Sequence, residues 1–206
     1  MKPGATFRHP AAGWMHVALM AVLVVMVAIP LVAVWVTFVK PHVVGTGATD
    51  FTLTDQDGRP WTLSQARGHE AVALFFGYTH CPDVCPTTLA KLTRARRTLG
   101  REAQALRIVF VTVDAQRDTP AVLKRYVALF DPSVVGLTGP RARTGPVYEA
   151  YHVWHQVVPN SSSAAGYLVA HSSAIYPIDR NGRLRSMTDW ADSVNELSRD
   201  LKGLIS

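Results

Sequence analysis

The sequence predicts an α/β fold in which helices flank both faces of a mixed β-sheet. Two largely apolar runs of strand length, 71–78 and 106–114, are typical of central strands that are covered on both sides. Apolar residues at helical spacing follow each run, over 87–100 and 119–130. This order of strand, helix, strand and helix, with a hairpin pattern and a final helix behind it, indicates one domain over residues 50–206.

An uncharged segment precedes this domain. Residues 14–39 carry no charged side chain and are long enough to cross a bilayer as one helix, in which Pro30 is tolerated as a kink. A cleaved signal peptide would have a shorter apolar stretch and a small-residue cleavage site. We therefore expect an uncleaved transmembrane signal anchor over 14–39, with cleavage near 45–48 as the alternative.

The charges around the anchor predict its orientation. Lys2 and Arg8 precede it and Lys40 alone follows it closely, so the positive-inside rule places residues 1–13 in the cytoplasm and the domain outside. Residues 40–49 are then a linker that leaves the membrane. No amphipathic presequence rich in Arg and Ser precedes the anchor. We therefore expect a single-pass protein of the bacterial inner (plasma) membrane, with its C-terminal domain in the periplasm.

The composition excludes two classes of protein. The whole chain has a formal net charge of +6, but without the three basic residues around the anchor residues 50–206 have 18 basic and 15 acidic side chains. That balance is too even for a nucleic-acid-binding surface, so we expect no nucleic-acid partner. Two cysteines in 206 residues also exclude a fold held together by a disulfide framework.

Local patterns predict the individual elements. Residues 50–68 alternate apolar and polar side chains around Asp57-Gly58, which is typical of a β-hairpin. The strand over 71–78 ends at a loop that contains both cysteines. In the helix over 87–100, leucines lie opposite lysine and arginine side chains, which is the pattern of a helix with one buried face.

The second half of the domain continues this alternation. We expect, in order, a strand over 106–114, a helix over 119–130, a short strand over 134–139, a helix passing into a strand over 143–158, a loop over 161–165, a hairpin over 172–187 and a helix over 192–205. Pro120 suits the first turn of its helix, and Asn181-Gly182 suits a tight hairpin turn. Asp192 or Ser193 is the expected cap of the last helix.

The loop "GYTHCPDVCPTTL" (77–89) holds Cys81 and Cys85 between a central strand and its helix. A cysteine pair in this place makes the thioredoxin-like architecture, in its peroxiredoxin-like variant, the simplest interpretation. A helix N-terminus lowers a thiol pKa, and residues four apart lie on one helix face. Three residues between the cysteines give a wider bite than the redox spacing of two. The pair is therefore a redox switch, a disulfide or a metal clasp; as a clasp, two thiolates favour copper(I), with zinc next.

Two thiolates rarely satisfy either ion, so a third ligand is expected, and the candidates are the eight histidines and five methionines of the chain. His171 begins a loop just before a predicted core strand, and a thioredoxin-like fold brings that segment opposite the cysteine loop. His152 and His155, three residues apart, are candidates for a small site of their own, although a helix end also uses histidine for hydrogen bonds. The side chain of His80, next to Cys81, is expected to point away.

At this point the sequence resembles a known family. "GYTHCPDVCPTTL", "VTVDAQRDTP", "FDPSVVGLTG" and "AHSSAIYPIDRNG", in this order behind an N-terminal anchor, are similar to the Sco/SenC family of copper-binding proteins. The resemblance covers about residues 45–206. It implies a thioredoxin-like domain that binds a copper ion through Cys81, Cys85 and His171. It also implies a role in assembling the dinuclear copper centre of cytochrome c oxidase, with the subunit that carries this centre, and a copper donor protein, as partners.

The chain departs from the family pattern at two positions. Ala170 stands where the family often has an aspartate before the ligand histidine, and such a carboxylate would orient the imidazole. Pro177 occupies a usually aliphatic strand position and predicts an edge or a bulge there, because proline cannot donate to a ladder. Asp114 and Asp118 match the family and are candidates for lining the site; a strand-end turn and a helix cap explain them equally well.

Three functions compete for the cysteine pair. The first is a membrane-tethered copper chaperone, which is not an enzyme. The second is a thiol–disulfide reductase in which Cys81 and Cys85 are a redox-active pair that keeps the copper-ligand cysteines of the oxidase subunit reduced. The third is a peroxidase, because peroxiredoxins share the fold and a similar Val-Cys-Pro-Thr stretch; Cys85 would then attack peroxide, but Pro82 replaces the threonine of those enzymes.

Overall fold

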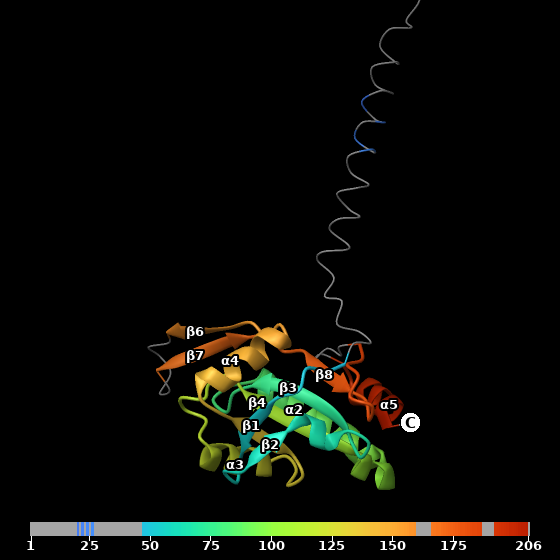
Figure 1. Cartoon of the computed structure of the whole chain (residues 1–206), viewed down its shortest axis with the longest axis horizontal. Helices are drawn as coiled ribbons and strands as arrows, with labels where there is room; N and C mark the ends of the chain where they lie inside the picture. Colours follow the sequence, from blue (N-terminus) through green and yellow to red (C-terminus); the bar gives the residue numbers. More distant parts are fainter. Residues whose placement is uncertain are drawn as a thin grey trace, which may run out of the picture. The chain divides into compact units, whose positions relative to one another are not determined.

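The computed structural model describes residues 47–159, 166–186 and 192–205, together with Met20, Val22, Val24 and Met26 (Figure 1). The predicted N-terminal segment 1–13 and loop 161–165, and almost all of the predicted anchor and linker, lie outside these residues. Within the described part of the chain, no helix combines the length and the apolar character that crossing a bilayer requires.

A six-stranded mixed sheet forms the centre of the domain, in the order β2-β1-β5-β4-β3-β8. The strands are β1 (Thr52–Asp55), β2 (Pro60–Thr62), β3 (Ala71–Gly77), β4 (Leu106–Thr112), β5 (Val135–Thr138) and β8 (Ile175–Ile178). The central strands β3, β4 and β5 are parallel. Strands β1 and β8 pair antiparallel to β5 and β3, and β2 pairs antiparallel to β1. This arrangement confirms the predicted mixed sheet and the predicted hairpin over 50–68.

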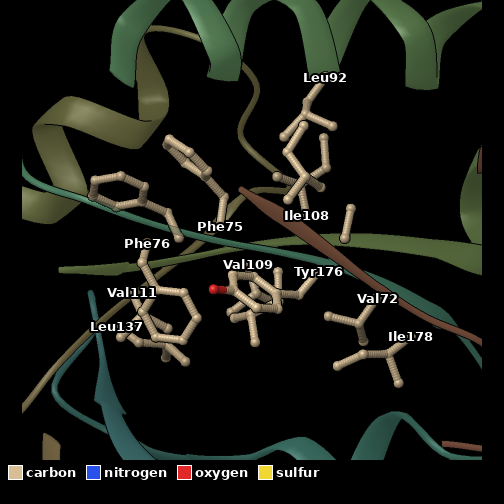
Figure 2. Close-up of a cluster of buried hydrophobic side chains, with 14 of the residues drawn as sticks. Val72, Phe75, Phe76, Leu92, Ile108, Val109, Val111, Leu137, Tyr176 and Ile178 are labelled. Carbon is tan, nitrogen blue, oxygen red and sulfur yellow. The ribbon is translucent and has the colours of Figure 1, made fainter. Parts of the chain in front are cut away.

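In the described part of the chain, four α-helices cover the two faces of the sheet (Figure 1). They are α2 (Val84–Thr98), α3 (Pro120–Ala128), α4 (Arg141–Ala150) and α5 (Val194–Ile205), and the short 3₁₀ helices η1 (Leu63–Ala66) and η2 (Gly100–Ala105) join strands. Figure 2 shows Phe75, Ile108 and the α2 residue Leu92 on one side of the sheet. Phe76, Val109 and Val111 lie on the other side (Figure 2).

Aromatic contacts place the helices on these faces. The ring of Phe110 packs against Phe75 and against Tyr126 of α3. On the opposite face, Phe76 packs edge-on against Tyr148 of α4 and Tyr176 of β8. Because consecutive strand residues point to opposite faces, Phe75 and Phe76 anchor the two layers from one strand. All seven residues of β3 are buried, as the continuous apolar run predicts.

Two features at the C-terminal side of the sheet follow from local chemistry. The strand β8, which contains Pro177, is the edge of the sheet, as the proline predicts. The Pro177 carbonyl accepts a hydrogen bond from the N–H of Arg185, so the backbone polar groups of Pro177 point away from β3. The missing N–H of proline therefore removes no hydrogen bond between β8 and β3. The expected capping of α5 is also confirmed, because Ser193 and Glu196 exchange side-chain-to-backbone hydrogen bonds in a capping box.

The structure differs from the sequence expectation in two places that concern the site. The helix expected over 87–100 begins at Val84, because Pro86 in the first turn needs no intrahelical donor and does not delay the helix. A second, two-stranded antiparallel sheet was not expected as such: β6 (His155–Pro159) pairs with β7 (Tyr167–His171). His171 is therefore the last residue of a strand, and the loop before β8 starts at residue 172.

Candidate metal centre

The two cysteines lie where β3 passes into α2. Cys85 is in the first turn of the helix and is buried, whereas Cys81 is in the preceding loop and is half-buried. The backbone N–H of Cys85 points at the Sγ of Cys81, at 3.4 Å. The start of the helix thus donates to the loop sulfur, the arrangement that favours a thiolate at a helix N-terminus. Both cysteines are free thiols and form no disulfide with each other.

The third group arrives from the opposite side of the loop. His171, at the end of β7, places its Nε2 at 3.3 Å from the Sγ of Cys85. Its Nδ1 lies 2.8 Å from the carbonyl oxygen of Ser172, so Nδ1 carries the proton and Nε2 has its lone pair free for a ligand. Its ring also packs edge-on against Tyr78. A backbone carbonyl thus orients this imidazole, the task that a carboxylate at Ala170 would perform.

These three side chains form the candidate metal centre. The ligand atoms of Cys81, Cys85 and His171 all lie within 4.8 Å of one another, and this is the one such group of three among the described residues. Two thiols and one imidazole are a soft donor set, which suits copper(I) best and zinc next. The structure therefore brings together the three residues that the sequence analysis selected, two of them 86 or more positions away from the third along the chain.

The pKa values of the two thiols are shifted in opposite directions. A hydrogen bond from Cys85, supported by the backbone N–H groups of Cys85 and Asp83, lowers the pKa of Cys81 to about 4 against the effect of burial. The hydrogen bond to Cys81, followed by burial and by the negative charge of Cys81, raises the pKa of Cys85. The pair therefore holds one proton at neutral pH, with the thiolate on the accessible cysteine.

We expect this difference to appear in thiol alkylation by iodoacetamide. The lowered pKa keeps Cys81 ionised, so its rate should stay nearly constant between about pH 8 and pH 6, where an ordinary thiol slows about tenfold per pH unit. Cys85 should react far more slowly throughout. Mass spectrometry of each cysteine at a series of times measures both rates. In Cys85→Ala the hydrogen bond that is the largest cause of the shift is lost, and the Cys81 rate should regain pH dependence. A steep profile in the wild type would contradict the assignment.

Asp118 anchors the cysteine loop through hydrogen bonds. This fully buried carboxylate accepts hydrogen bonds from the N–H of Thr79 at 2.9 Å, from the hydroxyl of Thr79 at 2.6 Å and from the hydroxyl of Thr112 at 2.6 Å. Nδ1 of His80 lies 3.8 Å from the same carboxylate. Asp118 is therefore no member of the three-ligand cluster; it ties the loop before Cys81 to the end of β4.

A neighbouring network supports the strand that carries His171. The Arg117 guanidinium pairs with the carboxylate of Asp114, lies 3.6 Å from the centre of the Tyr167 ring and donates to the Tyr167 carbonyl at 3.0 Å. The Tyr167 hydroxyl donates to Asp114 at 2.9 Å. Tyr167 is the first residue of β7. The segment 112–118 therefore contacts both the loop before Cys81 and the strand that carries His171. Asp114 and Asp118 match the family motif, which left open whether they line the site or have a structural role.

The remaining histidine candidates are outside the three-residue cluster. His80 is exposed, and its Nδ1 is 3.0 Å from the hydroxyl of Thr79. His152 is exposed in the turn after α4 and has a left-handed backbone, with φ of 53°. His155 is half-buried on β6, directly opposite His171 in the hairpin. His155 thus has a second possible partner besides His152, namely His171 on the neighbouring strand.

Comparison with known proteins shows the family of this chain. The family model described as SCO1/SenC matches residues 42–206. The chain belongs to the SCO1/SenC family. Among curated Sco relatives, the SCO2-like protein of Rickettsia felis is 36% identical over 154 residues, 75% of each chain. The mitochondrial SCO2 homologue of Bos taurus is 39% identical over 157 residues, and there this chain spans 58% of the relative's length.

Solved Sco structures share the fold. The structure of Bradyrhizobium japonicum ScoI with copper bound is 38% identical, with a TM-score of 0.70, and the match covers 77% of this chain and 99% of that one. Arabidopsis thaliana ScoI with copper bound is 30% identical, with a TM-score of 0.72, over 78% of this chain and 98% of that one. The predicted mixed α/β architecture is thus that of the Sco proteins, and two of these relatives hold copper.

Proposed function

We propose that this protein is a membrane-anchored copper chaperone of the Sco type, which carries copper(I) on Cys81, Cys85 and His171. The observation that carries the proposal is the convergence of two sulfurs and one unprotonated imidazole nitrogen within 4.8 Å. The copper-bound relatives support it, because they share the family and the fold. The low pKa of Cys81 supports it further, since the thiolate is the form that binds metal.

The burial of the three groups suggests how copper would enter and leave. Cys85 is buried, whereas Cys81 and His171 are half-buried, so an incoming donor or acceptor reaches the latter two first. Three ligands leave a position for a fourth, which allows exchange of one ligand at a time without a free ion. Cys85 would then be the last protein ligand released.

The family resemblance points to the recipient. We propose that copper passes to the subunit of cytochrome c oxidase that carries the dinuclear copper centre, and that a separate donor protein supplies it. The uncharged segment 14–39 would confine the domain to the outer side of the bacterial inner membrane, where the oxidase is also embedded. Such confinement shortens the search between the two proteins.

A reductase function is the second candidate, favoured by the acidity of Cys81. The Cys81 thiolate would attack a disulfide of the oxidase subunit and form a mixed disulfide, which Cys85 would resolve. The subunit then leaves as a dithiol, and an external thiol reductant must restore the Cys81–Cys85 disulfide to the dithiol. A peroxidase is disfavoured, because Cys85, the position that would attack peroxide, is buried and has a raised pKa.

An anaerobic copper(I) titration of the full chain in detergent tests the chaperone. We expect about one copper(I) per wild-type chain, little tight binding by Cys81→Ser or Cys85→Ser, and at least about tenfold weaker binding by His171→Ala, since even outer contacts of a metal site are worth about 10–100-fold. Reduction of a model disulfide should survive in His171→Ala, because that reaction needs no imidazole. Wild-type affinity in His171→Ala would overturn the three-ligand proposal.

A further inference from the structure

A second histidine faces the candidate metal centre across the β6–β7 hairpin. The register of this hairpin pairs His155 directly with His171. The adjoining pair, Trp154 and Ser172, is hydrogen-bonded, with the Ser172 N–H donating to the Trp154 carbonyl at 2.9 Å. Hydrogen-bonded and non-hydrogen-bonded pairs alternate in an antiparallel ladder, so His155 and His171 form a non-hydrogen-bonded pair. Such partners have Cβ atoms about 4.5–5.5 Å apart on the same face of the sheet.

The surroundings of His155 hold it on that face. Its ring packs edge-on against Tyr148, with ring centres 4.8 Å apart. In His171 the Ser172 carbonyl accepts from Nδ1, which leaves Nε2 for a ligand.

His155 is accessible from solvent. It is half-buried and lines a cavity of about 640 Å³ together with Tyr148, Tyr167 and Val169. It also lines a neighbouring pocket beside His152 and Trp154. A metal ion in solution can therefore reach His155 through either pocket.

We propose that His155 and His171 together form a second metal site, a two-imidazole pair that takes up divalent copper. Imidazole nitrogen is a preferred ligand of copper(II), whereas the two thiolates beside it suit copper(I). The cross-strand spacing allows two imidazoles to chelate one ion, with water on its remaining positions. The proposal rests on the proposed function only in that both sites use His171.

The test removes the thiols and keeps the histidines. The full chain with Cys81→Ser and Cys85→Ser is titrated with copper(II), and nitrogen hyperfine structure is read by electron paramagnetic resonance. We expect one copper(II) per chain with two imidazole ligands. Adding His155→Phe, which keeps the ring against Tyr148, or His171→Ala should weaken binding by about 10–100-fold. No binding by the thiol-free parent, or equal binding by either variant, would overturn the proposal.

Two controls keep the result interpretable. His152→Asn removes the nearby exposed histidine at a left-handed position that asparagine tolerates, and we expect unchanged copper(II) affinity. His155→Gln provides a second replacement, so that a folding defect of one variant does not decide the matter. In the chain with both cysteines intact, His155→Phe should still bind copper(I) with wild-type stoichiometry. Loss of that binding in wild type and variant alike would refute the chaperone proposal instead.

Discussion

Replacing Gly77 with alanine is expected to destabilise the domain by about 3 kcal/mol, the upper end of the usual cost of overpacking a core. Gly77 ends β3, immediately before the cysteine loop. A Cβ at this position would lie 2.8 Å from the Sγ of Cys85 and 2.8 Å from a ring carbon of Phe110. Both neighbours are buried and held by secondary structure, so neither can move aside without shifting α2 or β4.

The same substitution should also weaken copper(I) binding, because the clash pushes on a proposed ligand. Urea denaturation measures the loss of stability, and an anaerobic copper(I) titration measures the affinity. Gly203→Ala in α5 is the matched control, since no atom lies within 4 Å of the added methyl group there. It should leave both quantities unchanged or raise stability slightly. A Gly77→Ala protein as stable as the control would show that the packing around Cys85 is looser than the structure indicates.

Replacing Asp118 with alanine should cost a similar amount, about 3 kcal/mol. The carboxylate satisfies the N–H and hydroxyl of Thr79 and the hydroxyl of Thr112. Hydrogen bonds to a charged acceptor are each worth about 1.5–3 kcal/mol. Truncation leaves the buried Thr112 hydroxyl without this acceptor, whereas the donors of half-buried Thr79 can turn to solvent. The contributions are not additive, because the three donors share one acceptor and part of the loop can relax.

The effect on copper separates positioning from general destabilisation. We expect copper(I) affinity of Asp118→Ala to fall about tenfold even at temperatures where the protein is fully folded, because the loop that carries Cys81 loses its anchor. Asp118→Asn, which keeps one acceptor oxygen, should recover part of both losses. Asp57→Ala, at an exposed turn, is the control and should change neither. Unaltered affinity in folded Asp118→Ala would mean that Asp118 serves the fold alone.

Much of the fold could be predicted from local patterns. The apolar runs at β3 and β4 identified the central strands, because a strand buried on both faces has no polar alternation. Asp57-Gly58 marked a turn, and Asp192 or Ser193 marked a helix start, since both features depend on residues close together in the chain. Pro86 did not delimit α2 from the sequence, because proline is equally compatible with the loop and with the first helical turn.

The candidate site was only partly visible in the sequence. Cys81 and Cys85 could be identified as site residues from their spacing and their position after a strand. His171 was selected through a topological expectation and a family resemblance, and its carbonyl partner Ser172 was not foreseen. The strand β7 escaped notice because its segment carries no strong alternation and pairs only with β6, which is itself exposed.

Patterns within about ten residues were enough to predict most of the strands and helices, the two sulfurs and the uncharged N-terminal segment, because these features depend on near neighbours in the chain. Tertiary contacts were needed to show which histidine meets the sulfurs, which carboxylate holds the loop and which residue lies opposite His171. Those contacts join segments up to 86 positions apart. Their geometry is set by strand register and by the packing of β3 against α2, and neither is written in any short stretch of sequence.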